Sequence, residues 1–249
     1  MRTPLCICVA ASAFIAAGAP AHAADMRGMP PPMMAAGPGW TGCYIGGHLR
    51  ISGEDTKTNT FNTVTGALDR SDGYNKSNAY DGLQLGCDLA MSSRVVVGGV
   101  ADVSSGERRD EIFTDPTGTI SFKTHTDIHA QGTVRGRIGY TFENVPILSS
   151  VLLYGTGGWA WMNTSFTRTQ LVGITGLAVP GTAESARLTR SGPTGGVGIE
   201  WYFGKNWTWF LQYRYTDFGS ATVTYPIAQR SATITTTQNA LEFGLNYRF

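Results

Sequence analysis

The dominant pattern in this chain is an alternation of apolar and polar residues with a period of two. From residue 241 to residue 249 every second residue is apolar or aromatic, and the residues between them are polar or glycine. Successive side chains of a β-strand point to opposite faces, so this pattern predicts a strand with one apolar and one polar face. The same period recurs over residues 127–140, 196–203 and 209–216, and helical spacing fits none of these windows.

Eight segments of this kind are expected, at approximately 40–51, 80–91, 94–104, 125–141, 150–161, 192–203, 207–217 and 234–249. Short connections alternate with long polar connections, which are predicted as loops at 52–79, 105–124, 162–191 and 218–233. Outer-membrane barrels have an even strand number, short periplasmic turns and long extracellular loops. The pattern therefore predicts an all-β fold, an eight-stranded antiparallel up-and-down transmembrane β-barrel over residues 40–249.

Aromatic residues bear on the choice between a membrane barrel and a soluble one. A soluble lipocalin-type barrel also has eight strands, but its apolar residues point inward. Membrane barrels carry girdles of aromatic residues at both interfaces. Here aromatic residues fall largely near segment ends: Tyr140, Trp159, Trp161, Trp201, Trp207, Trp209, Tyr213, Tyr215, Tyr247 and Phe249. The membrane barrel is favoured, and the soluble barrel that binds a ligand remains an alternative.

The N-terminal residues have the features of a secretory signal peptide. Arg2 supplies a positive charge, residues 5–17 form a short apolar core, and residues 21–23 form a small-x-small site, which predicts cleavage after Ala23. The core is shorter than the roughly 20 residues of a transmembrane helix, and no later apolar run approaches that length. Residues 24–39 are rich in Met, Pro and Gly and are predicted to form a flexible periplasmic leader.

Composition and charge exclude several other classes. The chain is 42% hydrophobic and only 15% charged, which argues against intrinsic disorder. Its formal net charge is +1 and it has no basic run, so no nucleic-acid partner is expected. The glycines of residues 155–158 lack the spacing of a phosphate loop and lie in a predicted strand, so no cofactor is predicted.

Charged residues recur on the polar face of several predicted strands. In a narrow barrel this face points inward, so charges from different strands would meet and pair. Removing one partner of a buried ion pair is costly. We therefore predict an ion-pair network that plugs the lumen, formed by Arg135, Arg137, Glu200, Arg214, Glu242 and Arg248.

Five short stretches, taken in order, resemble a known family. They are residues 40–47 (WTGCYIGG), 134–140 (VRGRIGY), 153–158 (LYGTGG), 213–219 (YRYTDFG) and 246–249 (NYRF). Together they are similar to the small outer-membrane β-barrel proteins of alphaproteobacteria, the outer-membrane immunogenic or "porin family" group related to the OmpA transmembrane domain. The resemblance implies a C-terminal signal read by the barrel-assembly machinery, with Tyr247 and Phe249 at the matching positions. Cys43 and Cys87 depart from the family, which usually has aromatic residues there.

The two cysteines of the mature chain are candidates for a cross-strand disulfide. Cys43 lies near the start of the first predicted strand and Cys87 near the end of the second, so antiparallel pairing brings both to the periplasmic rim. Export delivers them to an oxidising compartment. A register difference of two residues would separate them beyond the reach of a bridge, which leaves two free cysteines facing lipid as the alternative. No histidine lies near enough in sequence to indicate a metal site.

Two histidines are candidates for catalytic or metal-ligating residues. His125 and His129 are four residues apart, which is roughly 13 Å along a strand, too far for both to bind one metal ion. No serine adjoins His129 in the sequence, and Asp127 with His129 is interpreted as a polar pair in the barrel lumen or at its rim. Neither a metal site nor catalysis is predicted.

The sequence therefore predicts a monomeric outer-membrane protein with a structural and surface role, not an enzyme. Expected partners are outer-membrane lipid, lipopolysaccharide and, during biogenesis, the barrel-assembly machinery. The loops are expected to serve as an antigen or host-contact surface. The alternatives are a narrow porin-like channel for small solutes, a lipid-A-modifying enzyme and the soluble barrel.

Overall fold

A computed structural model describes residues 39–92, 94–105, 108–114, 120–145, 148–172, 176–226 and 229–249. The predicted signal peptide and all but the last residue of the predicted leader lie outside these ranges. The strands are β1 (Gly42–Asn62), β2 (Leu68–Ala90), β3 (Val95–Ser105), β4 (Arg108–Thr114), β5 (Ile120–Val145), β6 (Leu148–Val172), β7 (Leu177–Ala178), β8 (Glu184–Tyr202), β9 (Trp207–Tyr225) and β10 (Arg230–Arg248).

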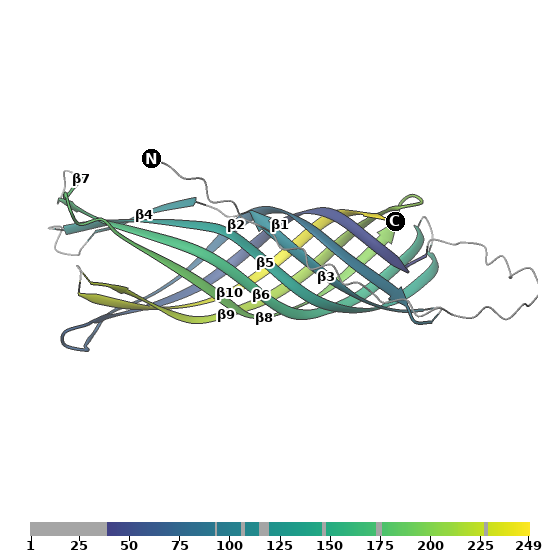
Figure 1. The fold of residues 1–249 in the computed structure, drawn as a ribbon, viewed down its shortest axis with the longest axis horizontal. Coiled ribbons are helices and arrows are strands. Elements are labelled where there is room, and N and C mark those ends of the chain that lie inside the picture. Colours follow the sequence, from purple (N-terminus) through teal and green to yellow (C-terminus); the bar gives the residue numbers. More distant parts are fainter. Residues whose placement is uncertain are drawn as a thin grey trace, which may run out of the picture. The chain divides into compact units, whose positions relative to one another are not determined.

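Eight of these strands form a closed antiparallel ring (Figure 1). Its order is β5-β3-β2-β1-β10-β9-β8-β6, and pairing between β5 and β6 closes it. The other two strands are additions: β4 continues beyond β3 along β5, and the two-residue β7 pairs with β6. The predicted eight-stranded antiparallel fold is confirmed. Within the described residues, no helix is long and apolar enough to cross a membrane.

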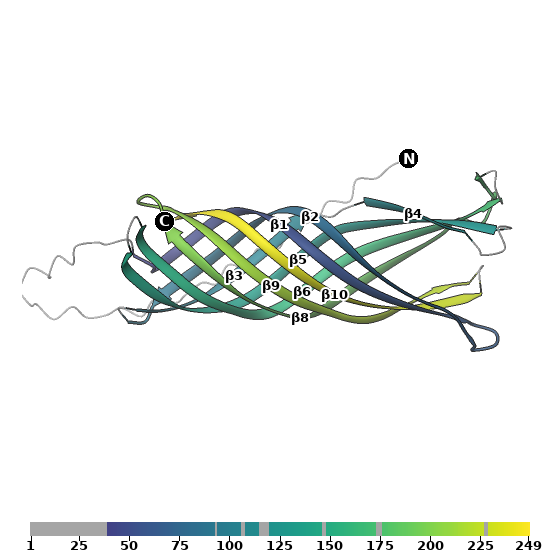
Figure 2. The ribbon, with the colours of Figure 1, turned by 180° about the vertical axis from the view of Figure 1, so that it is seen from behind.

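The prediction of long loops is wrong for most of their length, because strands occupy these segments. β1 and β2 continue through the predicted loop at 52–79 and leave only residues 63–67 between them. Similarly, β9 and β10 leave only residues 226–229 of the predicted loop at 218–233. A membrane-spanning strand needs about 9–11 residues, whereas seven of the ring strands have 19 to 26. The strands therefore extend well beyond a membrane at one end, here called the far end (Figure 2). The near end holds Gly42, Phe249 and the connections from β2 to β3, from β5 to β6 and from β8 to β9.

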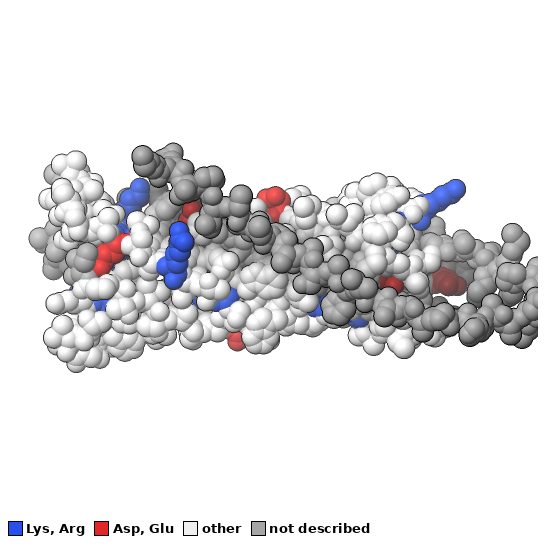
Figure 3. Space-filling view, viewed as in Figure 1, with Lys and Arg blue, Asp and Glu red and all other residues white. Residues whose placement is uncertain are grey.

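Near-end strand halves are apolar outside and polar inside. Outward residues such as Leu49, Leu83 and Leu153 are exposed by more than half of their surface. Inward residues of the same strands, such as Arg50 and Gln84, are buried. On the face shown in Figure 3, Lys, Arg, Asp and Glu side chains are few and scattered. This arrangement is the opposite of a soluble lipocalin-type barrel, and it makes an outer surface suited to lipid.

Toward the far end the ring divides into two sheets. The β8–β9 ladder stops at Thr194 and Thr216, and the β2–β3 ladder stops at Gly82 and Ser104. Beyond these points β4, β5, β6 and β8 stay paired as one sheet, and β9, β10, β1 and β2 as the other. Pro193 immediately precedes Thr194 in the sequence and is the first residue of β8 beyond the ladder toward the far end. Proline has no N–H to continue the pairing.

A β-bulge in the same region bends β9. The register of β9 against β10 shifts between Thr235 and Thr237, opposite Gly219. Gly219 has φ of 65°, and its N–H donates to Asp217 Oδ1 at 2.8 Å. Glycine takes this conformation without steric cost, and bulges bend the strand that carries them.

The two far-end sheets pack through an apolar core of their own. It contains residues from both sheets: Phe166, Val223, Tyr225, Ala232 and Ile234, with Ala186 and Leu188 packed against them. Arg168 lies over the Tyr225 ring at 5.5 Å from its centroid. Burial raises the pKa of the Tyr225 hydroxyl, and the nearby Arg168 guanidinium opposes that rise. The extended strands therefore form a two-layered structure, called here the far-end sandwich.

Candidate functional site

The barrel lumen is the candidate functional site because it collects the buried charges of the chain. All six residues of the predicted network point inward and are at most 6% exposed. They do not form one network. The structure divides them between two clusters and adds three charged residues to them: Arg50, Asp88 and Asp102.

The near-end cluster consists of two carboxylates and two guanidinium groups. Arg137 contacts Glu200 (Nη2 to Oε2, 2.6 Å) and Asp88 (Nε to Oδ1, 3.3 Å). Arg248 contacts the same two carboxylates, with Nη1 3.1 Å from Glu200 Oε1 and Nη2 2.6 Å from Asp88 Oδ2. Each carboxylate thus faces both cations, and the charges of this cluster balance.

Aromatic and polar side chains complete the near-end cluster. Arg137 lies over the Tyr154 ring at 4.3 Å, and Arg248 lies over the Trp40 ring at 5.0 Å. The Thr208 hydroxyl donates to Glu200 Oε1 at 2.6 Å. These contacts hold the guanidinium planes across the lumen, since an arginine over an aromatic face is attracted by the ring electrons.

The middle cluster contains three arginines and two carboxylates. Asp102 contacts Arg50, Arg135 and Arg214 at 3.0, 2.9 and 3.2 Å. Glu242 contacts Arg214 at 2.6 Å and also pairs with Arg50. Because three cations face two anions, this cluster has one excess positive charge.

Apolar groups flank the two clusters. Near the near end, Trp40, Val96, Leu152, Tyr154 and Tyr202 form one buried group. Farther along the axis, between the middle cluster and the far-end sandwich, a second group contains Ile128, Ala160, Met162 and Phe218. Side chains therefore fill the lumen at successive levels rather than only at the ion pairs.

Sequence reasoning missed three charged residues of the clusters. Asp102 stands between Ala101 and Val103 in a segment with little polar alternation, and Asp88 adjoins a cysteine. The parity of each strand was the available signal. Asp88 and Arg50 share the inward parity of Gln84 and His48 in their strands, so counting every charged residue of that parity would have found them.

Cys43 and Cys87 are directly opposite each other in the β1–β2 ladder. The structure joins them by a disulfide with S–S 2.01 Å. The bridge lies near the first residue of β1 and the last residues of β2, at the near end.

The C-terminal residues lie on the outer wall of the near end. Tyr247 packs edge-on against Trp207, with ring centroids 5.0 Å apart. Phe249 is 72% exposed, and its backbone N–H donates to the Cys43 carbonyl at 3.0 Å. Both side chains point outward and are exposed. Their recognition by the barrel-assembly machinery remains a prediction.

The histidines need one correction. A serine does adjoin His129, although not in the sequence: Ser165 on β6 lies 2.8 Å from its Nε2. The strand pairing across β5 and β6 creates this contact. Within the described residues no hydrogen bond joins His129 to a carboxylate, which a catalytic triad requires for orientation of the base. In the described part of the chain no group of three or more His, Cys, Asp or Glu is placed to hold a metal ion.

Comparisons with known proteins agree with this architecture. Residues 7–249 match the family model described as outer membrane protein beta-barrel domain. A 31 kDa outer-membrane immunogenic protein of Brucella melitensis is 27% identical over 220 residues, covering 84% of each chain. A 22 kDa outer membrane protein of Rhizobium leguminosarum is 30% identical over 118 residues, covering 47% of this chain and 46% of the relative.

A solved structure of another outer-membrane protein is similar in fold. The outer membrane protein OprG of Pseudomonas aeruginosa aligns with a TM-score of 0.50 at 14% identity, covering 84% of this chain and 96% of that one. An identity this low bears on the fold alone. The closed antiparallel ring, its apolar outer belt and the family match lead to one conclusion: the chain is an outer-membrane protein of the outer membrane protein β-barrel domain family.

Proposed function

We propose that this barrel has a structural role in the outer membrane, with a closed lumen and a far end that serves as an exposed surface. The observation that carries the proposal is the filling of the lumen by two ion-pair clusters and the apolar groups beside them. An eight-stranded barrel has an interior just wide enough for side chains to fill. Such a barrel seals the membrane that it spans.

The far-end sandwich supports the surface role. Outer-membrane barrels have short periplasmic turns and longer extracellular segments. Because the strands extend beyond the membrane at the far end, the far end is assigned to the cell exterior and the near end to the periplasm. The similar Brucella protein is named an immunogenic protein, which favours an exposed antigen or host-contact surface here. Outer-membrane lipid, lipopolysaccharide and the barrel-assembly machinery are the proposed partners of a monomeric barrel that has no enzymatic role.

Conductance in planar lipid bilayers tests the closed lumen. The purified, refolded wild-type barrel is expected to give small or undetectable single-channel steps. Large, stable steps would overturn the proposal, because they require a continuous water path past both clusters. A barrel with the same insertion efficiency but a known open pore serves as the positive control.

A second candidate function is a narrow passage for small anions. It is favoured by the excess positive charge of the middle cluster and by three buried nitrogens without a hydrogen-bond partner among the described residues, Arg135 Nη1, Arg214 Nε and Gln212 Nε2. This function predicts small steps with a reversal potential that favours chloride over potassium. Steps of that kind, reduced in Arg214→Gln, would select the channel over the closed barrel.

A further inference from the structure

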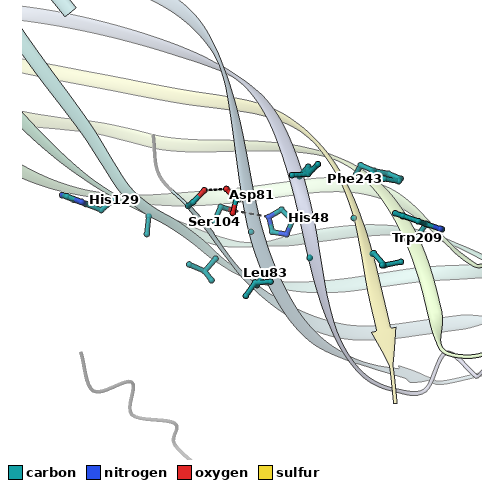
Figure 4. A pocket seen from close by; sticks show the side chains of 15 residues that line it. His48, Asp81, Leu83, Ser104, His129, Trp209 and Phe243 are labelled. Atoms are coloured by element: carbon teal, nitrogen blue, oxygen red, sulfur yellow. Dashed lines mark hydrogen bonds between the residues drawn. The ribbon is translucent and has the colours of Figure 1, made fainter. Parts of the chain in front are cut away.

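A groove of about 630 Å³ lies on the outer wall of the barrel, over β10, β1, β2, β3 and β5 (Figure 4). Outward apolar side chains form its walls, among them Leu49, Leu83, Val103 and Leu245. Trp209 and Phe243 stack at 4.9 Å between ring centroids and close one side. The groove is continuous with the apolar belt that faces lipid.

Glycines form the floor of the groove, and the lumen is filled behind them. Gly47 points outward, and a Cβ atom there would meet only the Gly82 carbonyl oxygen, at 3.8 Å. Behind the floor, His48 Nε2 would lie 2.5 Å from a Cβ at Gly82, and Phe210 would lie 2.4 Å from one at Gly244. The groove therefore opens only to the outside, and the missing side chain at Gly47 leaves room for a ligand.

The far side of the groove is polar. Asp81, Ser105 and His129 lie where the outward row changes from apolar to polar along β2, β3 and β5. Asp81 is opposite the exposed Leu49 in the ladder, so its carboxylate borders the apolar belt. The Ser105 hydroxyl donates to Asp81 Oδ1 at 2.5 Å and is the only hydrogen-bond partner of this carboxylate among the described residues.

We propose that this groove binds an acyl chain of lipid A, with a hydroxyl or amide N–H of that lipid donating to Asp81. The position of the polar side rests on the assignment of the far end to the cell exterior, which places Asp81 in the outer leaflet. A carboxylate at the edge of lipid accepts hydrogen bonds and repels phosphate. The ligand group beside it must therefore be a donor.

This requirement separates lipid A from phospholipid. The ester region of a glycerophospholipid offers acceptors only, whereas the amide-linked hydroxyacyl chains of lipid A offer hydroxyl and N–H donors at the same depth. Apolar walls of the groove would take the hydrocarbon of either lipid. Selectivity for lipid A then comes from Asp81, and affinity comes from the volume left free at Gly47.

Native mass spectrometry of the refolded full-length mature barrel in detergent micelles, titrated with lipid A or with phosphatidylcholine, which has no hydrogen-bond donor, tests the proposal. Gly47→Leu fills the groove, and Asp81→Asn replaces the carboxylate by a neutral amide. Gly157→Leu is the matched control, since it adds the same outward side chain on β6, where no atom lies within 4 Å of the new Cβ.

The wild-type barrel is expected to bind lipid A at least tenfold more tightly than phosphatidylcholine. Gly47→Leu should weaken lipid A binding about tenfold or more, and Asp81→Asn should remove most of the preference over phosphatidylcholine. Gly157→Leu should bind as wild type does. Equal binding of the two lipids by wild type, or unchanged lipid A binding in Gly47→Leu, would overturn the proposal. Neither result bears on the proposal of a closed lumen, which the conductance measurement tests separately.

Discussion

The near-end half of the barrel and the far-end sandwich share strands, and β9 and β10 reverse their polarity between the two regions. Along β10 the inward residues are Arg248 and Glu242 at the near end but Ile234 and Ala232 at the far end. The outward residues change the other way, from aromatic and aliphatic residues to a run of threonines at 233, 235 and 237. β10 keeps β1 and β9 as its neighbours in both regions. What changes is the medium outside the strand and the packing inside it.

This inversion shows what each region must exclude from its interior. In the membrane the outer face meets hydrocarbon, so apolar side chains go outside and charges pair inside. Above the membrane both outer faces meet water, so burial of apolar side chains between two sheets stabilises the sandwich as in a soluble domain. Substitutions that exchange the two environments should therefore have opposite effects in the two regions.

The largest expected effect comes from the middle cluster. Glu242→Gln removes a carboxylate that faces Arg50 and Arg214, and breaking a buried ion pair typically costs about 3–5 kcal/mol. Urea unfolding of the barrel in liposomes should show a lower midpoint. The exposed Asp55→Asn on the far-end outer face is the control and should change the midpoint little. Equal midpoints for the two variants would show that the ion pairs do not stabilise the lumen.

One outward position in each region of β9 tests the change of solvent directly. Leu211→Arg places a charge in the lipid-facing belt, at a cost of roughly 2–4 kcal/mol near the bilayer midplane. Thr222→Arg, on the same face farther along the strand, should cost less than about 0.5 kcal/mol because water solvates it. Folding yield and unfolding midpoint in liposomes measure both. Equal costs would mean that the membrane boundary does not lie between these residues.

The core of the far-end sandwich should respond locally. Ile234→Ala removes buried side-chain volume between the two sheets, and such changes cost about 2 kcal/mol or more in a packed core. Hydrogen exchange should become faster in the far-end parts of β6, β9 and β10 but not in their near-end parts. The outward neighbour Thr235→Ala should leave exchange unchanged. Faster exchange throughout the ring would show that the two regions unfold as one unit.

The smallest expected effect is at the Ser165 and His129 pair. Because no carboxylate orients His129 among the described residues, Ser165→Ala should not change the amount of fatty acid released when the barrel is incubated with lipid A. Mass spectrometry of the lipid gives the measurement. Release by wild type that disappears in Ser165→Ala would instead identify an enzyme.

The sequence determined the near-end half of the molecule because one physical rule governs it. A period of two with large aromatic residues at segment ends predicts strands with a lipid-facing side, and the same parity predicts that Arg135, Glu200 and Arg214 point inward. The far-end strands escaped this reasoning. In the far-end part of β1, for example, the inward residues Glu54 and Thr56 are polar like the outward residues Asp55 and Lys57, so no apolar and polar alternation marks a strand there.

Only the tertiary structure decided which inward charges meet. Closure of the ring fixes how far neighbouring strands are displaced, and that displacement brings Arg137 and Arg248 to Asp88 and Glu200, and Arg214 to Asp102. The same pairing across β5 and β6 places Ser165 beside His129. The end of the β8–β9 ladder at Thr194 opens one of the two gaps that divide the far end into two sheets. Parity is a local property of a strand, whereas partners across a lumen depend on the positions of all eight strands.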